Sequence, residues 1–480
     1  MKILLVYPPI SLWERYSSDI GHSGGRQIPL GVYYLAAYIS KVGHNVYVID
    51  GEAQEMTIAA VGAKALEYGP DIVGISSTTV AFHRALEMAR EIKLRIPDTP
   101  VVVGGPHVTA VREDVLRNQE FDFAVYGEGE ETLKELIDTL AGGGNLSLVK
   151  GLAFRNNGVP TINDPRPFIA DMDGIPFPAY DLIADFSHYN PPPTNYKRLP
   201  VVNVITSRGC PNHCTFCGHS AFGRTLRQRS PENIAAEIEL LYNRYHVREI
   251  AFVDDTFTIR PERIFDLFKI LNHKKIHFPW TCMSRINTVD FETIKFMKDQ
   301  GCWHISFGIE SGNEDILRLI RKNISLADTK KVIGWCHQVG ILTKGFFIIG
   351  HPGETLATIE QTIQTALALP LDDVVVTLNT PLPGTEQYQT AEDYGSMKRG
   401  DWSRFNMWNP VFVPKGLTED ILLKKHQEFY RRFYLRPRIM VRYVRSFLSR
   451  SGLRRAMSVI QSIPFMFGRR KKSKRRNHAH

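Results

Sequence analysis

Short apolar runs alternate with amphipathic helical patterns along most of the chain, and this alternation restricts the possible folds most strongly. In the first part the strand-like runs are KILLVYPP (2–9), NVYVID (45–50), DIVGISS (71–77), PVVVGG (100–105) and FAVYGEGE (123–130). Helical patterns such as LGVYYLAAYISKVG lie between them. Strands that are separated by helices pair in parallel. Residues 1–142 are therefore predicted to form an α/β domain with a doubly wound, Rossmann-like sheet.

Small and polar residues follow these strands, at the sheet edge where doubly wound domains bind their ligands. The candidates for contact with a large ligand are Ser76, Thr78, Gly104, Gly105, Gly127 and Glu128. Glycine has no side chain, so a ligand can approach the backbone closely there. The same residues also suit ordinary strand-to-helix turns, and the pattern alone leaves both interpretations open.

A second alternation begins near Leu199. Its strand candidates are VVNVITSRG, EIAFVDDTF (249–257), FPWTCMSRI (278–286), CWHISFGIESG (302–312), LTKGFFIIGHPGET (342–355) and DVVVTLNTPLPGT (373–385). Such repeats predict a full or partial β/α (TIM-like) barrel over residues 199–400, with its chemistry at the C-terminal ends of the strands. Residues 143–198 are rich in Pro, Gly and Asp and are predicted to form a linker.

Three of the six cysteines, Cys210, Cys214 and Cys217, lie within eight positions directly after the first barrel strand. The sequence shows neither an export signal nor an apolar run of the roughly 18 residues that a membrane span needs. We therefore expect a cytoplasmic protein with reduced thiols. Clustered thiols in that compartment indicate a metal site rather than disulfides.

Two metals compete for these thiols. Zinc could take His213 or His219 as a fourth ligand and would make the chain a non-catalytic binding protein, but the usual second pair of zinc ligands is missing. A [4Fe–4S] cluster is held by Cys thiolates, one for each iron, and three would leave one iron open. The other cysteines, Cys282, Cys302 and Cys336, lie in strand or helix patterns typical of core residues.

Cys-x3-Cys-x-aromatic-Cys after the first strand of a β/α barrel resembles the radical S-adenosylmethionine (AdoMet) superfamily. GIESG (308–312) is similar to its fourth-strand segment, where Glu310 would approach the AdoMet. GFFIIGHPGET (345–355) is similar to its fifth-strand motif, which would bring Ile349 and Gly350 near the adenine.

Two further segments, VDDTF (253–257) and SRIN (284–287), resemble the second- and third-strand ends of the same superfamily. Arg285 is a candidate partner of the AdoMet carboxylate, because guanidinium binds carboxylate in a two-pronged fork; a structural salt bridge is the alternative. Phe216, beside Cys217, could shield the cluster from water.

The resemblance implies a mechanism as well as a site. The open iron would chelate AdoMet, and an electron from the reduced cluster would split it into methionine and a 5′-deoxyadenosyl radical. The three cysteines would be the cluster ligands, and a flavodoxin- or ferredoxin-type protein would supply the electron.

A doubly wound domain ahead of such a barrel resembles the cobalamin-binding radical AdoMet group. This group includes the anaerobic magnesium-protoporphyrin monomethyl ester cyclase and the cobalamin-dependent methyltransferases. Cobalamin is therefore expected as a cofactor, and a domain that has lost cobalamin or holds substrate instead is the alternative. The Asp-x-His-x-x-Gly element that gives a histidine to cobalt is absent, because Asp19 and His22 have the wrong spacing.

The resemblance implies an enzyme that functionalises an unactivated C–H bond of a small apolar substrate such as a lipid or tetrapyrrole. Methyl transfer is favoured, and oxidative ring closure of the cyclase type is the alternative. A tRNA methylthiotransferase fits less well, because that family carries an additional N-terminal cluster and this chain has no cysteine before Cys210.

The C-terminal part is strongly basic. From Lys424 onward the chain has 18 Lys and Arg residues and a single acid, Glu428. Apolar residues recur between the arginines at helical spacing: Phe429, Phe433, Val441, Val444 and Phe447. We expect a helical extension over 401–468 and a disordered basic tail over 469–480. Peripheral contact with the inner face of the membrane is favoured over nucleic acid, and a helical cap on the barrel is the alternative.

Overall fold

The computed structural model describes the chain except residues 17–20, 22–23, 220, 447–464 and 466–480. A seven-stranded sheet forms the N-terminal part, in the order β2-β1-β3-β4-β5-β6-β7. Its five parallel strands are β1 (Lys2–Tyr7), β2 (Asn45–Asp50), β3 (Ile72–Ser76), β4 (Val101–Gly104) and β5 (Phe123–Val125). The doubly wound prediction is confirmed.

Helices cover both faces of this sheet because its buried strands are apolar on both sides. Successive residues of a strand point to opposite faces: Ile3 and Leu5 join one core, Leu4 and Val6 the other. The helices of this domain are α1 (Leu12–Tyr16), α2 (Leu30–Lys41), α3 (Ile58–Tyr68), α4 (Phe82–Arg95), α5 (Pro106–Val111) and α6 (Gly129–Gly142). The first core includes α2 and α6, and the second includes α3 and α4.

The segment 143–198, predicted as a linker, contains more regular structure than its composition indicates. β6 (Leu152–Asn156) and β7 (Val159–Ile162) form an antiparallel hairpin that extends the sheet beyond β5. Both turn residues, Asn157 and Gly158, have positive φ. Asn-Gly favours this tight turn, so the signal was present but was obscured by the Pro and Gly content around it.

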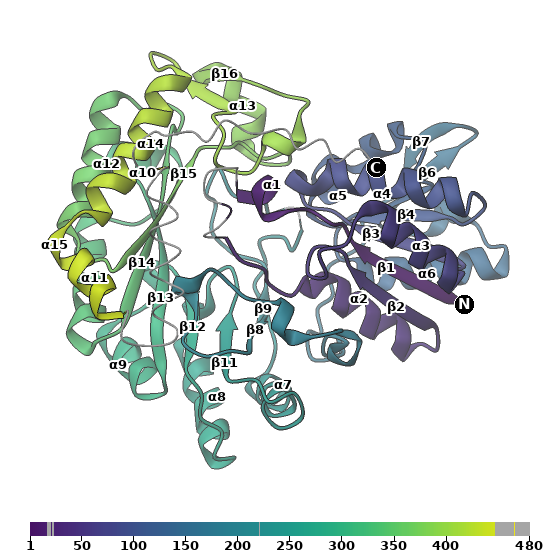
Figure 1. The fold of residues 1–480 in the computed structure, drawn as a ribbon, viewed down its shortest axis with the longest axis horizontal. Coiled ribbons are helices and arrows are strands. Elements are labelled where there is room, and N and C mark those ends of the chain that lie inside the picture. Colours follow the sequence, from purple (N-terminus) through teal and green to yellow (C-terminus); the bar gives the residue numbers. More distant parts are fainter. Residues whose placement is uncertain (17–20, 22–23, 220, 447–464, 466–480) are drawn as a thin grey trace.

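A second, curved sheet of six parallel strands follows, in the order β15-β14-β13-β12-β11-β8 (Figure 1). The strands are β8 (Val201–Val204), β11 (Glu249–Phe252), β12 (Trp280–Ser284), β13 (Cys302–Glu310), β14 (Leu342–Ile349) and β15 (Asp373–Leu378). The helices between them are α7 (Pro231–Arg244), α8 (Pro261–His273), α9 (Phe291–Asp299), α10 (Glu314–Leu319), α11 (Leu326–Val339) and α12 (Leu356–Ala368). Since β8 and β15 do not pair with each other, the predicted barrel is a partial one.

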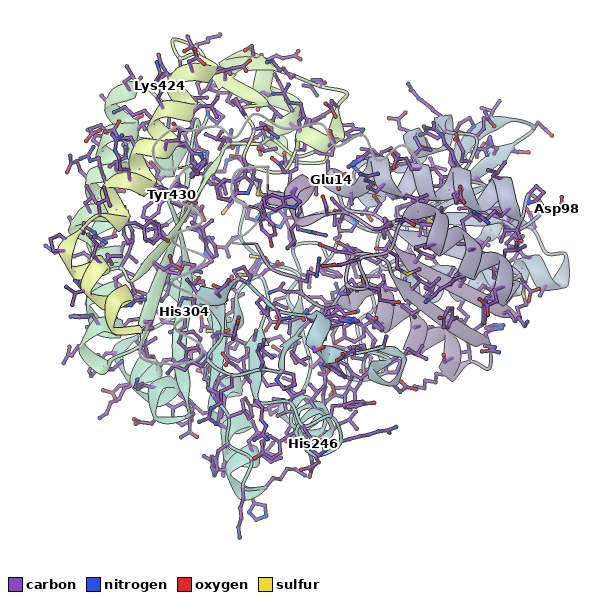
Figure 2. The ribbon with its side chains drawn as sticks, in the orientation of Figure 1. Glu14, Asp98, His246, His304, Lys424 and Tyr430 are labelled. Carbon is purple, nitrogen blue, oxygen red and sulfur yellow. The ribbon has the colours of Figure 1, made fainter. Side chains whose placement is uncertain are left out.

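The C-terminal extension packs on the last strand of the partial barrel. The range predicted for it, 401–468, contains β17 (Phe412–Pro414), α14 (Glu419–Tyr434) and α15 (Pro437–Ser446), and it is preceded by α13 (Glu386–Tyr394) and by β16 (Gly395–Met397), which pairs with β17. Figure 2 shows Tyr430 on α14; its hydroxyl donates to the carbonyl of Val376 and accepts from its N–H. These two bonds satisfy the backbone N–H and carbonyl of Val376 at the open edge formed by β15. An edge without such partners would be free to pair with another chain.

The apolar residues that recur between the arginines of the C-terminal part lie in two different environments. Phe429 and Phe433 are fully buried, as a helical cap on the barrel requires, whereas Val441 is half exposed. The side chain of Val444, the residue Phe447 and the basic end 469–480 lie outside the described residues.

Candidate active site

The three clustered cysteines lie in a loop closed by a short antiparallel pair, β9 (Ser207–Arg208) and β10 (Arg227–Gln228). The loop follows β8, at the C-terminal end of the barrel strands, as predicted. Gly209 begins it with φ +87°, and a Cβ there would lie 2.3 Å from the carbonyl oxygen of Thr225, so only glycine fits. Cys210 and Cys214 are buried and Cys217 is exposed, and none forms a disulfide.

The cysteine loop has the donor chemistry of a cluster site. Although Cys217 is exposed at the surface of the loop, protein surrounds most of its thiol, and this desolvation, followed by repulsion from Asp255 and from the other two cysteines, raises the pKa of Cys217 to about 12. Thiolates there need positive charge beside them, which metal binding supplies. Within the described part of the chain, no three His, Cys, Asp or Glu side chains are arranged to share one metal ion. A [4Fe–4S] cluster fits better, because each thiolate binds a different iron.

Arg285 and Glu310 lie beside this loop. Arg285 follows β12, and its Nη1 is 3.5 Å from the Sγ of Cys214 while Nη2 donates to the carbonyl of Lys322. Among the described residues its guanidinium pairs with no carboxylate, so the structural salt bridge is not observed. Glu310 ends β13 with φ +69°, an uncommon conformation for a residue other than glycine that is often found at functional sites.

Lys322, which the sequence analysis missed, is the second cation of the site. Its Nζ is 2.7 Å from the Oε1 of Glu310, and both side chains are buried. Lys322 also lies over the ring of Phe216, 5.9 Å from its centroid. A Cβ on Gly308 would lie 2.6 Å from this Nζ, so glycine makes room for the pair. Lys322 follows α10 rather than a strand end, so strand-end motifs gave no signal for it.

The charges around the cysteine loop suit an anionic cluster with an amino-acid ligand. Arg285 and Lys322 supply two cations, and Glu310 supplies one acid. A ligand with both a carboxylate and an ammonium group, such as AdoMet, can find opposite charges there.

The end of β14 forms the next wall. Ile349 is fully buried, and Gly350 has φ +86°. Glu354 accepts from the N–H groups of Gly350 and His351, and burial raises its pKa to about 8. Burial lowers the pKa of His351 to about 3, and neither ring nitrogen has a hydrogen-bond partner within the described part of the chain. The centroid of its ring is 5.8 Å from that of Phe216.

One cavity of about 560 Å³ is lined by all six residues that were predicted to contact a ligand at the N-terminal sheet edge. These are Ser76, Thr78, Gly104, Gly105, Gly127 and Glu128. The barrel domain contributes Asn203, Ile205, Arg208, Ala221, Phe222 and Val253 to the same lining. The walls are mainly apolar, and the buried hydroxyl of Thr78 has no hydrogen-bond partner among the described residues.

These features fit cobalamin, a large ligand with apolar surface and amide edges. Gly105 has φ +100°, and a Cβ there would lie 2.7 Å from the carbonyl of Ser77. Glu128 is the exception, because Arg208, Arg227 and a backbone N–H already occupy its carboxylate. His22 lies outside the described residues.

Comparison with known proteins supports the assignment of both the barrel domain and the N-terminal domain. Residues 204–366 match the Radical SAM superfamily, and residues 17–137 match the B12 binding domain. The chain is 36% identical to an uncharacterised methyltransferase, PH0819, of Pyrococcus horikoshii, over 92% of this chain and 94% of that protein. The chain belongs to the radical SAM superfamily, in the group with a B12-binding domain. It is an enzyme, and its cofactors are the [4Fe–4S] cluster, AdoMet and cobalamin, as predicted.

Two other similarities extend over most of this radical SAM enzyme. It is 30% identical to the anaerobic magnesium-protoporphyrin IX monomethyl ester cyclase of Cereibacter sphaeroides, over 91% of this chain and 71% of the cyclase. The fold resembles that of OxsB, a cobalamin-dependent AdoMet radical enzyme solved with aqua-cobalamin and AdoMet bound. The TM-score is 0.74 at 16% identity, over 97% of this chain and 75% of OxsB.

Proposed function

We propose that this enzyme transfers a methyl group to an unactivated carbon of a small apolar substrate such as a lipid or a tetrapyrrole. The observation that carries the proposal is the cavity of about 560 Å³ that both domains line. Its lining joins the glycine-rich edge of the B12-binding sheet to Ala221 and Phe222 of the cysteine loop. The loop that carries the three cysteines therefore reaches the cavity through Ala221 and Phe222, so a methyl carrier in the cavity would lie close to the radical source, as reaction on one substrate requires.

Each group of residues has a distinct role in this proposal. Cys210, Cys214 and Cys217 would hold the cluster, and Arg285 and Lys322 would pair with the AdoMet carboxylate. When bound, the cofactors supply the radical and the methyl group. The protein binds them, orients them and excludes water, which the apolar walls of the cavity favour.

The relatives support a methyl transfer and an apolar substrate. The Pyrococcus relative is named a methyltransferase, and the Cereibacter relative is named for a tetrapyrrole ester. The second name keeps oxidative ring closure as the alternative reaction.

The test is an anaerobic assay with protein loaded with iron, sulfide and cobalamin. The enzyme, a reductant and AdoMet with a trideuterated methyl group are incubated with lipid and tetrapyrrole fractions, and products are analysed by mass spectrometry. We expect a product that has exchanged one hydrogen for CD3. A product that has lost hydrogen without gaining the label indicates the cyclase reaction instead. If neither appears while 5′-deoxyadenosine forms, the proposed substrate class is wrong; Cys214→Ala protein is the blank.

We also propose that a flavodoxin- or ferredoxin-type donor reduces the cluster, and that this cytoplasmic enzyme touches the inner membrane face through its basic C-terminal part. Among the described residues, no helix is long and apolar enough to cross a bilayer. On α15, Met440 and Val441 are half exposed beside Arg438, which suits an anionic, partly apolar surface.

Vesicle flotation tests the membrane proposal. The full chain should float with vesicles rich in anionic phosphatidylglycerol and not with neutral phosphatidylcholine, and a chain that ends at residue 446 should bind less. Equal recovery with both vesicle types contradicts the proposal, and retention on RNA but not on vesicles assigns the tail to nucleic acid.

A further inference from the structure

Four buried charges join the B12-binding domain to the stem of the cysteine loop. They are Glu128 and Glu130 on one side and Arg208 and Arg227 on the other, and each side chain is at most 8% exposed. Two acids and two guanidinium groups compensate each other, so the set is neutral. We call these four residues the interdomain ion cluster.

The two acids come from the turn that borders the cofactor cavity. Glu128 directly follows Gly127, and Glu130 lies in the first turn of α6. Negative side chains at this end also interact favourably with the helix dipole. Both acids line the cavity. The position of the two acids is therefore tied to that of the glycine turn proposed to contact cobalamin.

The two arginines come from opposite strands of the stem of the cysteine loop. Arg208 and Arg227 are directly paired in the β9–β10 ladder, and Arg208 precedes Gly209 and Cys210. Arg227 is fixed by further bonds, from Nη1 to the carbonyl of Ile169 and from Nη2 to that of Phe222. The stem therefore has little freedom to rotate.

Arg208 binds both acids of the B12-binding domain at once. Its Nη1 is 2.9 Å from Glu128 Oε1, and its Nη2 is 2.6 Å from Glu130 Oε1. The guanidinium lies over the rings of Tyr34 and Phe222, 5.4 and 5.2 Å from their centroids. A planar fork held by two separate carboxylates defines both distance and orientation, which an apolar contact does not.

We infer that Arg208 is a positioning residue that sets the separation of the two cofactors through the interdomain ion cluster. Buried ion pairs contribute little net stability compared with apolar packing, and their best-supported use is to select one geometry. Here the selected geometry is the distance and orientation of the glycine turn at Gly127 relative to the cysteine loop. The inference rests on the proposed function, because it needs cobalamin and the iron–sulfur cluster in these two places.

The test substitutes Arg208→Lys, which keeps the positive charge but cannot bind both carboxylates as a rigid fork. Wild-type and variant proteins are loaded with both cofactors, and iron and cobalamin contents are measured. Cob(II)alamin and the reduced cluster each carry an unpaired electron, so electron paramagnetic resonance reports their spin–spin interaction, which falls with the inverse cube of their distance. We expect full cofactor content in Arg208→Lys but an altered or broadened interaction. A displacement of about 1 Å is the scale on which rates fall about 100-fold.

Arg229→Lys is the matched control. Arg229 is equally buried and pairs with Glu237, but both residues belong to the barrel domain. Its spectrum should match the wild type. If Arg208→Lys does not fold, Glu130→Gln breaks one arm of the fork and leaves the pair of Glu128 and Arg227 in place.

Three results decide the outcome. Unchanged spin–spin interaction in the Arg208 and Glu130 variants, at full cofactor content, overturns the inference. The same change in Arg229→Lys also overturns it, because the effect would then be a general loss of stability. Wild-type protein that binds the iron–sulfur cluster but no cobalamin refutes the proposed function itself, and the inference with it.

Discussion

Replacement of Lys322 by glutamine gives the sharpest test of the AdoMet site. The Nζ of Lys322 is 2.7 Å from Glu310 and lies over Phe216, beside the cysteine loop. Glutamine retains a donor for Glu310 but removes the charge that we assign to the AdoMet carboxylate. Because the change leaves the buried carboxylate of Glu310 without its cation, the variant should be less stable than the wild type, and its fold and iron content are checked before binding is measured.

The expected loss of affinity follows from the burial of the pair. A hydrogen bond to a charged group contributes about 1.5–3 kcal/mol. Because each 1.4 kcal/mol is tenfold in Kd, Lys322→Gln should weaken AdoMet binding about 10- to 150-fold. Arg285 remains in place, so binding should be reduced rather than abolished.

Equilibrium dialysis of labelled AdoMet against anaerobic protein measures this Kd, and the spectrum of the reduced cluster with and without AdoMet reports the same event independently. Lys344→Gln is the control, since Lys344 forms a similarly buried pair with Asp373 at the opposite end of β14. Wild-type affinity in Lys322→Gln, at full iron content, would show that Lys322 serves only as the partner of Glu310.

Three further predictions concern the cysteine loop and the end of β14. Cys214→Ala should lose most of its iron and form no 5′-deoxyadenosine, and full iron content would contradict the assignment of this ligand. Gly209→Ala should also lower iron content, because its Cβ would lie 2.3 Å from the carbonyl of Thr225; iron equal to wild type would mean that the loop can shift. Glu354, with a pKa raised to about 8, binds its proton more tightly in the folded state, so its contribution to stability is full below pH 4.5 and is lost as pH rises toward 8. The effect of His351 on stability has the opposite pH dependence. Because its pKa is lowered to about 3 in the folded state, stability is lost as pH falls below 6.5. The melting-temperature advantage of wild type over Glu354→Gln should therefore shrink between pH 6.5 and 8, and a constant difference would contradict the raised pKa.

Much of the fold could be predicted because its strands carry a local signal. Each barrel strand is an apolar run followed by a polar end, so it could be recognised within its own window. The hairpin of β6 and β7 was missed although Asn157-Gly158 marks it, because the surrounding Pro and Gly residues indicated a linker. The order of the strands and the open barrel edge under α14 depend on packing and had no such signal.

The sequence by itself determined the domain types and pointed to the candidate cluster ligands, since the strand–helix alternation and the spacing of Cys210, Cys214 and Cys217 are local patterns. Only the tertiary structure decided the partners of the charged residues. Glu128 was predicted as a ligand contact, yet its carboxylate binds Arg208, which lies 80 positions away in the sequence. Lys322 gained its candidate role only because it folds onto Glu310 across the site. Ion pairs of this kind depend on distance in space and on exclusion of water, and neither quantity is set by a residue's neighbours along the chain.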